Sequence, residues 1–399
     1  MDYRFSDRVK KLKPSAIREI FKYASDPDVI SLSAGNPAPD AFPVDAIRKC
    51  SEELLREQPI DALQYSVTEG LPALRDDVST FLKQHCGIAT PGDSILITSG
   101  AQQIMDLLGK SVINEGDTVV CEEPSFVGAL NSFRSYNAVL KGVPMQDDGM
   151  DLKKLEGILK SDSKVKFIYT IPNFQNPTGI TTSWEKRQGI YALAKKYDTL
   201  ILEDNPYGDL RFAGERIPSI KTLDTDGRVI YSGTFSKTIS PGMRVGFAVG
   251  GNALIQKMVV CKQGSDVHTN IWSQHVIHRF LHGWNFEEHL KNLQKIYAKK
   301  YAVAEKALNE TAQSLTYRPI QGGLFIWCTL PDSIPMMEYC KKAIQNKVCV
   351  VPGNAFLTDS SKPCQSFRIN YSSPADADLA RGISILGRQA KEWPADQQR

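Results

Sequence analysis

Apolar residues along the chain form two recurring patterns, short continuous runs and longer stretches with helical spacing. Before residue 250 there are seven apolar runs of strand length, centred near residues 95, 119, 140, 168, 201, 230 and 247. Between many of them, apolar residues recur every three or four positions, as in amphipathic helices. Strands that alternate with helices predict an α/β fold with a mostly parallel, helix-covered sheet.

The pattern changes towards the carboxyl end of the chain. Residues 271–312 predict a long helical stretch with one break. The last part of the chain predicts a smaller α+β unit, with strands at 323–329, 348–351 and 367–371, a helix at 334–346 and a closing helix. We therefore expect a large domain at 46–285 and a small domain at 286–399. Residues 1–45 are expected to belong to the small domain.

Composition narrows the classes of function. The 399 residues carry 48 basic and 45 acidic side chains, a net charge of +3, which gives no basic face for nucleic acid or a membrane surface. No run approaches the ~20 apolar residues that span a bilayer, and the charged start of the chain lacks a secretory signal. The eight cysteines show no paired spacing. We expect a cytoplasmic protein with reduced cysteines.

A lysine follows the predicted strand near residue 230. The strand ends at Tyr231, a loop with Thr234 and Ser236 comes next, and Lys237 is followed by Arg244 after a Pro-Gly turn. An isolated lysine in a polar loop is usually a surface residue. Here the amine could form a Schiff base with a carbonyl cofactor, while the hydroxyls and Arg244 bind a phosphate on that cofactor.

The strand near residue 95 leads into a possible anion site. It is followed by Gly100, Ala101 and Gln102 and then by a predicted helix. Free backbone N–H groups and the positive end of the helix dipole attract an anion at such a place. Because the chain has no G-x-G-x-x-G here, a dinucleotide is not the favoured ligand.

Three charged residues stand in or next to apolar strands. Glu203 and Asp204 end the strand near residue 201, and only one of them can face the site because side chains alternate along a strand. We assign Asp204 to the site. Arg368 lies within an apolar strand and requires an anion, for which a substrate α-carboxylate is well matched. The alternatives are a helix cap for Asp204 and a structural ion pair for Arg368.

The lysine segment SGTFSKTISPGMRVG resembles that of fold-type I, pyridoxal-phosphate (PLP)-dependent aminotransferases of class I and II. More narrowly, the chain is similar to the group of 2-aminoadipate and kynurenine aminotransferases, from about Pro14 to about Ser372. The resemblance implies a large domain with a seven-stranded sheet, one strand antiparallel, and a small α+β domain.

The resemblance also implies roles for individual residues. Lys237 would carry PLP as a Schiff base and transfer the substrate proton. Asp204 would pair with the pyridine nitrogen, and Asn176 of the N-P-T-G turn and Tyr207 with the ring oxygen. Phe126, where many relatives have tyrosine, would stack on the ring. The phosphate would be bound by Gly100, Ala101, Gln102, Thr234, Ser236, Arg244 and, from a neighbouring subunit, Tyr65.

Substrate residues and the partner follow from the same resemblance. The residues expected at the substrate are Arg18 in a predicted helix at 14–25, Gly35, Asn176, Phe356 and Arg368. If Tyr65 serves the neighbouring site, the enzyme is a homodimer. No metal is expected. His275, His278 and His282 have a spacing that suits zinc, but no acidic or cysteine ligand is interleaved, so packing and solvated histidines are favoured, including His289.

We therefore predict an aminotransferase that moves the amino group of an L-amino acid to a 2-oxo acid such as 2-oxoglutarate. The donor could be 2-aminoadipate, an aromatic or an aliphatic amino acid. One alternative is a PLP-dependent carbon–sulfur β-lyase on the same fold. Another is the aminotransferase-like part of a winged-helix transcription regulator. It is disfavoured because only about thirty residues precede the predicted substrate loop and the charge balance offers no DNA face.

Overall fold

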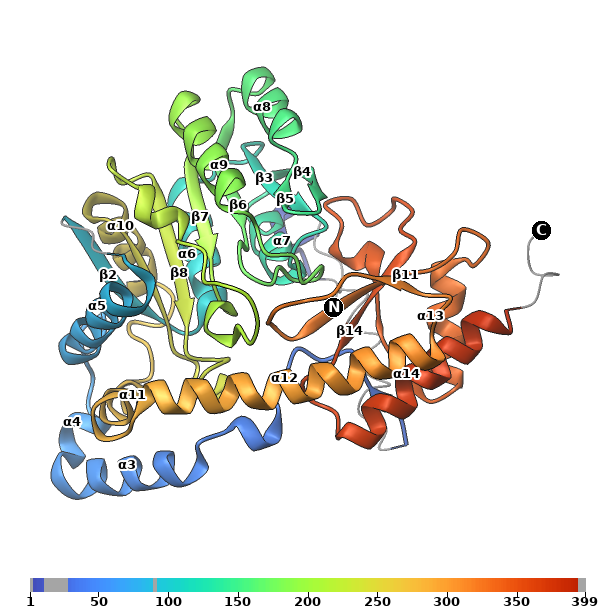
Figure 1. The fold of residues 1–399 in the computed structure, drawn as a ribbon. Coiled ribbons are helices and arrows are strands. Elements are labelled where there is room, and N and C mark those ends of the chain that lie inside the picture. The colour runs from blue at the N-terminus through green and yellow to red at the C-terminus, as the bar shows by residue number, and fades with distance from the viewer. Residues whose placement is uncertain (1–2, 11–27, 89–91, 394–399) are drawn as a thin grey trace.

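A computed structural model describes residues 3–10, 28–88 and 92–393. A large sheet of eight strands has the order β2-β9-β8-β7-β6-β3-β4-β5 (Figure 1). Its strands are β2 (Asp93–Thr98), β3 (Thr118–Glu123), β4 (Val139–Gln146), β5 (Gly149–Met150), β6 (Val165–Thr170), β7 (Leu200–Asp204), β8 (Val229–Thr234) and β9 (Gly246–Gly251).

The seven longer strands of this sheet are the seven that the sequence predicts. The strand β9 is antiparallel to both β2 and β8, whereas β3, β4, β6, β7 and β8 pair in parallel. The two-residue strand β5, which the sequence pattern missed, is antiparallel to β4. Its two residues follow a turn and are too few to show a periodic pattern.

Helices cover both faces of the large sheet because its strands are apolar on both sides. Val119 and Cys121 of β3 belong to one buried cluster and Val120 between them belongs to another. The first cluster includes residues of α5 (Pro72–Cys86), α6 (Ala101–Val112), α7 (Val127–Arg134) and α10 (Asn252–Gln263), and the second includes residues of α8 (Leu152–Ser161) and α9 (Trp184–Lys196). Alternation along each strand therefore builds two cores.

A small antiparallel sheet lies beside the large one (Figure 1). Its order is β10-β11-β14-β13, and its strands are β10 (Thr316–Tyr317), β11 (Phe325–Thr329), β13 (Val351–Pro352) and β14 (Ser366–Asn370). The strand expected at 348–351 is in fact two, because β12 (Val348–Cys349) leaves this sheet to pair with β1 (Ile30–Ser31). The helices nearby are α13 (Met336–Gln345) and α14 (Asp376–Lys391).

The remaining elements connect these parts. They include α1 (Asp7–Lys10), α3 (Val44–Glu57), α4 (Pro59–Leu63), α11 (Ile271–Gly283), α12 (Phe286–Thr311) and the short 3-10 helices η1 (Pro39–Ala41), η2 (Gly208–Leu210), η3 (Ile220–Leu223), η4 (Pro241–Met243) and η5 (Gly353–Phe356). The helix break predicted within 271–312 is the junction of α11 and α12. In Figure 1, α12 extends from α11 to α14 beneath both sheets. The domain limits at residues 45 and 285 stay a prediction.

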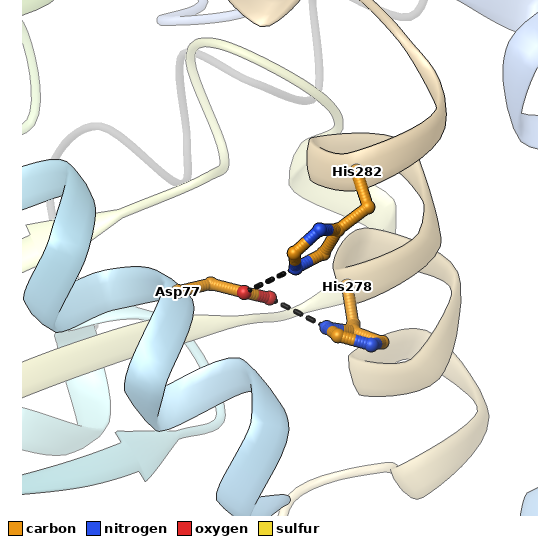
Figure 2. A group of neighbouring side chains, drawn as sticks. All are labelled: Asp77, His278 and His282. Carbon is orange, nitrogen blue, oxygen red and sulfur yellow. Dashed lines mark hydrogen bonds and ion pairs between the residues drawn. The ribbon is translucent and has the colours of Figure 1, made fainter.

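The sequence favoured packing and solvated positions for the histidines of α11 and α12, and the structure shows packing together with specific hydrogen bonds. His275 is buried, and His289 of α12 binds the carbonyl of Thr238. His278 and His282 both bind the carboxylate of Asp77 on α5 (Figure 2). Local spacing missed this partner because it lies about 200 residues away in the sequence.

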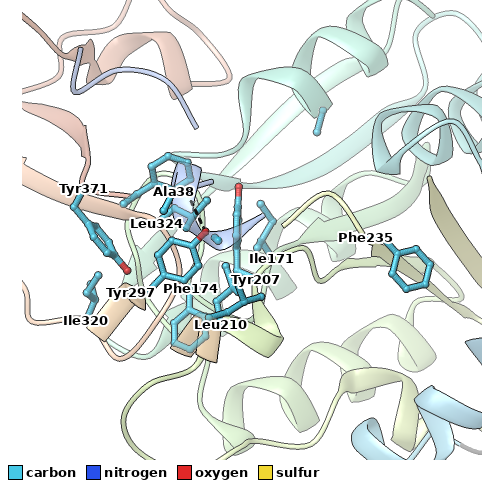
Figure 3. Packing of buried hydrophobic residues seen from close by; sticks show 14 of the residues in the cluster. Ala38, Ile171, Phe174, Tyr207, Leu210, Phe235, Tyr297, Ile320, Leu324 and Tyr371 are labelled. Carbon is cyan, nitrogen blue, oxygen red and sulfur yellow. Dashed lines mark hydrogen bonds between the residues drawn. The ribbon is translucent and has the colours of Figure 1, made fainter. Parts of the chain in front are cut away.

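Aromatic side chains fill the junction between the two sheets. Tyr207 follows β7, Tyr297 belongs to α12 and Tyr371 follows β14, and all three are buried (Figure 3). The Tyr297 hydroxyl accepts a hydrogen bond from the backbone N–H of Ala38 at 3.3 Å. The segment before α3 is thereby attached to the long helix. No helix in the described ranges has both the length and the apolar character that a membrane crossing needs.

Candidate active site

A cavity of about 340 Å³ opens at the carboxyl ends of five strands that run in one direction, β2, β3, β6, β7 and β8. Its lining residues are Gly35, Ala101, Gln102, Met105, Phe126, Val127, Ile171, Asn176, Asp204, Pro206, Tyr207, Thr234, Ser236, Lys237, Pro241, Arg244, Phe325 and Arg368. Ligands of open α/β sheets bind at this edge. Phe325 and Arg368 come from the small sheet, so the cavity lies between the two sheets.

One end of the cavity has the chemistry of an anion site. Gly100 precedes α6 with φ of +78°, so the first N–H groups of the helix have no intrahelical acceptor. Arg244, itself in the left-handed region at φ +56°, donates to the carbonyl of Ser99 at 3.1 Å. Thr234 and Ser236 bind each other through their hydroxyls at 2.9 Å. Guanidinium, hydroxyls and helix N-terminus together suit a phosphate monoester.

Gly100 is required in this cup for two reasons, its positive φ and its closeness to Arg244. A Cβ atom there would lie 2.4 Å from Nη2 of Arg244. We expect Gly100→Ala to displace the guanidinium and to weaken the affinity for PLP by about 10–100-fold, equivalent to ~1–3 kcal/mol. Titration of the cofactor-free protein with PLP, followed by tryptophan fluorescence, measures this change.

Gly87 offers a matched control for that substitution. It has a φ of +66°, yet a Cβ atom there would meet nothing within 4 Å. Gly87→Ala therefore introduces the same kind of backbone strain, on the order of 1–2 kcal/mol, without a clash. It should lower stability and leave PLP affinity unchanged. Equal losses of affinity in both variants would contradict the role of the cup.

Asp204 is a buried carboxylate held by two hydroxyls. Its Oδ1 accepts a hydrogen bond from Ser232 at 2.8 Å and its Oδ2 one from Tyr169 at 3.0 Å. Burial raises its pKa to about 6, although both hydrogen bonds act in the opposite direction. The neighbouring Glu203 faces away from the cavity and binds Ser219 and the backbone N–H of Ile220. A carboxylate so placed is suited to pair with a protonated ring nitrogen.

Lys237 lies in the same cavity and is half-buried. Its Nζ donates to the carbonyl of Gly35 at 2.9 Å. Burial, together with the charges of Arg368 and Arg244, lowers its pKa to about 8. Among the described residues, no carboxylate forms an ion pair with any of these three cations. The cavity therefore has a surplus of positive charge and an amine that readily becomes a neutral nucleophile.

The lowered pKa of Lys237 predicts that this lysine decreases the free energy of unfolding of the cofactor-free protein in a pH-dependent way. The pKa is about 8 in the folded state against 10.5 for a free lysine, so the unfolded state binds more protons between these values and stability rises with pH there. Lys237→Met removes this destabilisation because methionine does not bind a proton. In the absence of PLP, we expect the variant to be about 3 kcal/mol more stable at pH 7, the difference disappearing towards pH 10.5. Urea unfolding at pH 7 and pH 10 tests this. A constant difference across that range would refute it.

Arg368 lies at the other side of the cavity between two aromatic rings. Its guanidinium carbon is 4.1 Å from the ring centre of Phe325 and 4.9 Å from that of Phe356. It donates to the side chain of Asn176 at 2.8 Å and to the carbonyl of Ser33 at 2.7 Å, and its buried Nε has no partner within the described segments. Burial lowers its pKa to about 10. A buried cation with a free donor is suited to bind a substrate carboxylate.

The structure brings most of the predicted site residues into one place. Those that line the cavity are Gly35, Ala101, Gln102, Phe126, Asn176, Asp204, Tyr207, Thr234, Ser236, Lys237, Arg244 and Arg368. Gly100 adjoins it through Arg244, and Phe356 is buried behind Arg368. Tyr65 is 81% exposed and packs against His268, away from the lining of its own chain's cavity. Arg18 lies outside the described residues.

Sequence reasoning missed the residues that contact the site residues and orient them. Ser232 and Tyr169 bind Asp204, and Phe325 packs both on Arg368 and edge-on against Tyr207. Ser232 pairs with Asp204 in the register of β7 and β8. Once the order of these strands is known, this pairing becomes predictable.

Comparison with known proteins identifies the family. Residues 27–386 match the sequence model of "Aminotransferase class I and II". The chain belongs to this family. Aromatic-amino-acid aminotransferase 1 of Thermococcus litoralis is 37% identical over 399 residues, which cover 98% of this chain and 95% of that relative. The chain is thus a PLP-dependent aminotransferase that acts on amino acids and 2-oxo acids.

Two solved aminotransferases are similar over almost the whole chain. The kynurenine aminotransferase of Pyrococcus horikoshii, solved with PMP, kynurenine and kynurenic acid, is 37% identical with a TM-score of 0.93. The α-aminoadipate aminotransferase of Thermus thermophilus, solved with N-(5'-phosphopyridoxyl)-L-leucine, is 34% identical with a TM-score of 0.88. Each comparison covers 97% of both chains. The chain therefore lies in the aromatic, aminoadipate and kynurenine group of the aminotransferases.

The cavity fits the cofactor of this family. PLP combines a phosphate, an aldehyde and a pyridine ring, and the cavity offers an anion cup, an amine of lowered pKa and a buried carboxylate from separate elements. The aminotransferase would thus hold PLP by ionic contacts at both ends of the molecule.

Proposed function

We propose that this aminotransferase transfers the amino group of L-amino acids with aromatic, aliphatic or 2-aminoadipate side chains to a 2-oxo acid such as 2-oxoglutarate. The observation that carries the proposal is Lys237, a half-buried amine whose pKa is about 8, in one cavity with Arg368. A carboxylate clamp beside a lysine base is what abstraction of the α-proton of an amino acid requires.

We assign the cofactor contacts as follows. Asp204 would hold the pyridine nitrogen, Asn176 and Tyr207 the ring oxygen, and Phe126 one face of the ring. The phosphate would be held by Gly100, Ala101, Gln102, Thr234, Ser236 and Arg244. Bound PLP supplies an electron sink that makes the substrate Cα–H acidic.

The chain's own residues would move the proton. Arg368 orients the substrate by its α-carboxylate, which places Cα near Nζ of Lys237 in the same cavity. The neutral amine takes the α-proton and returns it as a general acid. Because burial and then the two arginines lower the pKa of Lys237, the base is available close to neutral pH.

The lining of the cavity supports apolar side chains. Apart from the groups assigned above, it contains Met105, Val127, Ile171 and Phe325, and its cations Lys237, Arg244 and Arg368 already have roles. The relative from Thermococcus litoralis is named an aromatic-amino-acid aminotransferase. We infer that the residues that line the described cavity are sufficient to bind an aromatic donor.

An acidic donor would need a further cation, which we assign to Arg18. We expect Arg18→Ala to reduce kcat/KM for 2-aminoadipate by about tenfold or more, a loss of ~1.5 kcal/mol for one charged hydrogen bond, and to leave that for phenylalanine unchanged. Coupled assays of glutamate formation from 2-oxoglutarate measure both rates. Equal losses for the two donors would remove Arg18 from the substrate site.

We propose a homodimer with shared sites. Several large apolar side chains are exposed around the start of α5, namely Ile60, Leu63, Tyr65 and Val67. In a dimer, Tyr65 would reach the phosphate cup of the second subunit.

The test of the proposed function is a visible spectrum of the PLP-loaded protein before and after addition of a single amino acid. Loss of the long-wavelength band with release of the matching 2-oxo acid would support transamination. Release of pyruvate and ammonia from cystathionine would instead indicate a β-lyase. A protein that takes up no PLP would overturn the proposal.

A further inference from the structure

Three potential metal ligands converge on the outer side of the large sheet, between α5 and α11. His278 Nδ1 lies 2.6 Å from Oδ2 of Asp77, and His282 Nε2 lies 2.7 Å from Oδ1 of the same carboxylate (Figure 2). One ligand atom from each of the three residues lies within 4.8 Å of the others. None of these residues lines the active-site cavity.

We propose that Asp77, His278 and His282 form a binding site for a divalent cation of borderline softness, for which Zn²⁺ is the probe. Two imidazoles and one carboxylate suit zinc, cobalt or nickel, whereas Mg²⁺ and Ca²⁺ prefer oxygen ligands alone. Three protein ligands leave the fourth tetrahedral position to water.

The helices already present the ligands in a convergent arrangement. His278 and His282 are four residues apart and share one face of α11, and Figure 2 shows both rings turned towards Asp77 on α5. Zinc bonds of ~2.0–2.2 Å place the ligand atoms of a tetrahedral site ~3.3 Å apart. Because only one oxygen of Asp77 takes a tetrahedral position, the nitrogen that now contacts this oxygen must move ~0.6 Å away from it, and the three ligand atoms, now within 4.8 Å of one another, must settle at this spacing. The His282 side chain, 64% exposed, is free to make this shift and leaves an entry path.

The two imidazole rings are close neighbours on either side of one carboxylate. Their centres lie 4.7 Å apart, and Asp77 contacts a ring nitrogen of each. A cation placed among the three groups would replace two hydrogen bonds by three ligand bonds.

The site would fasten α5 to α11 at a second point. The first is Gln274 of α11, whose side-chain oxygen accepts a hydrogen bond from the backbone N–H of Leu71 at 2.8 Å, next to the start of α5. Asp77 lies farther along α5. A metal that binds only the folded state stabilises it by mass action.

The test uses the PLP-loaded protein treated with a chelator and then titrated with ZnCl₂. We expect one equivalent of Zn²⁺ per chain and a higher Tm, with no change in Tm from MgCl₂ or CaCl₂. His282→Gln and Asp77→Asn should weaken Zn²⁺ binding at least about 100-fold, since even the loss of a ligand's hydrogen-bond partner costs about 10–100-fold. Because His282 is exposed, its variant should fold normally.

His85 provides the control. It lies on α5 outside the cluster, with its nearest acidic group, Glu287, 3.9 Å away. His85→Gln should keep the Zn²⁺-dependent rise of Tm. If Zn²⁺ causes no rise in the unmodified protein, or if the rise persists in His282→Gln and Asp77→Asn, the cluster is an ion-paired tie between helices and the proposal is overturned.

Discussion

Lys237→Ala is expected to lower kcat at least about 10⁴-fold with every amino-acid donor, because in the proposed mechanism it removes both the covalent anchor of PLP and the proton-transfer base. Among the described residues that line the cavity there is no second lysine, since the two other cations are Arg244 and Arg368. Single-turnover formation of 2-oxo acid, followed over hours, measures the residual rate.

Two readouts separate this loss from a folding defect. Borohydride reduction followed by mass spectrometry should fix the cofactor on the unmodified chain but not on the variant. PLP should still bind the variant reversibly, since the anion cup and Asp204 are unchanged. Lys257 on α10 is exposed, and Lys257→Ala should behave as the unmodified enzyme in both assays. Activity near normal in Lys237→Ala would refute the proposed mechanism.

The second large effect concerns Arg368. We expect Arg368→Ala to raise KM and to reduce kcat/KM on the order of 100-fold, ~3 kcal/mol, for all amino-acid donors whatever their side chain. The reason is that the buried guanidinium, oriented by Asn176 and Ser33, is proposed to bind the α-carboxylate, which all substrates share. Initial rates with phenylalanine, leucine and 2-aminoadipate test it.

Arg211 serves as the matched control for Arg368. It also stacks on an aromatic ring, 4.6 Å from the centre of Phe174, but it does not line the cavity. Arg211→Ala should therefore change stability more than KM. A loss confined to one donor in Arg368→Ala would contradict the α-carboxylate role and place Arg368 at the side chain instead.

Much of the site was predictable because several of its residues directly follow apolar runs that predict strands. Lys237, Asp204 and Gly100 each follow an apolar run that can only be a buried strand, and the parallel order of such strands brings their ends to one edge. Arg368 was conspicuous as a cation within an apolar strand. The roles of these residues came from the family resemblance.

Other features needed the contacts between distant segments. The hydroxyls of Tyr169 and Ser232 bind Asp204 from the strands on either side of it. Which side chains lie next to Asp204 depends on strand order and register. The sandwich of Arg368 between Phe325 and Phe356 depends on how the small sheet meets the large one.

By itself, the sequence determined the seven longer strands and placed the lysine and the glycine turn before α6 at their ends, because periodicity and turn residues act over a few neighbouring positions. Only the tertiary structure decided the pKa of Lys237, since burial and two distant arginines set it. It also decided the partner of His278 and His282. A helix places its own residues four apart on one face, but nothing in its spacing indicates that a neighbouring helix brings Asp77 between them.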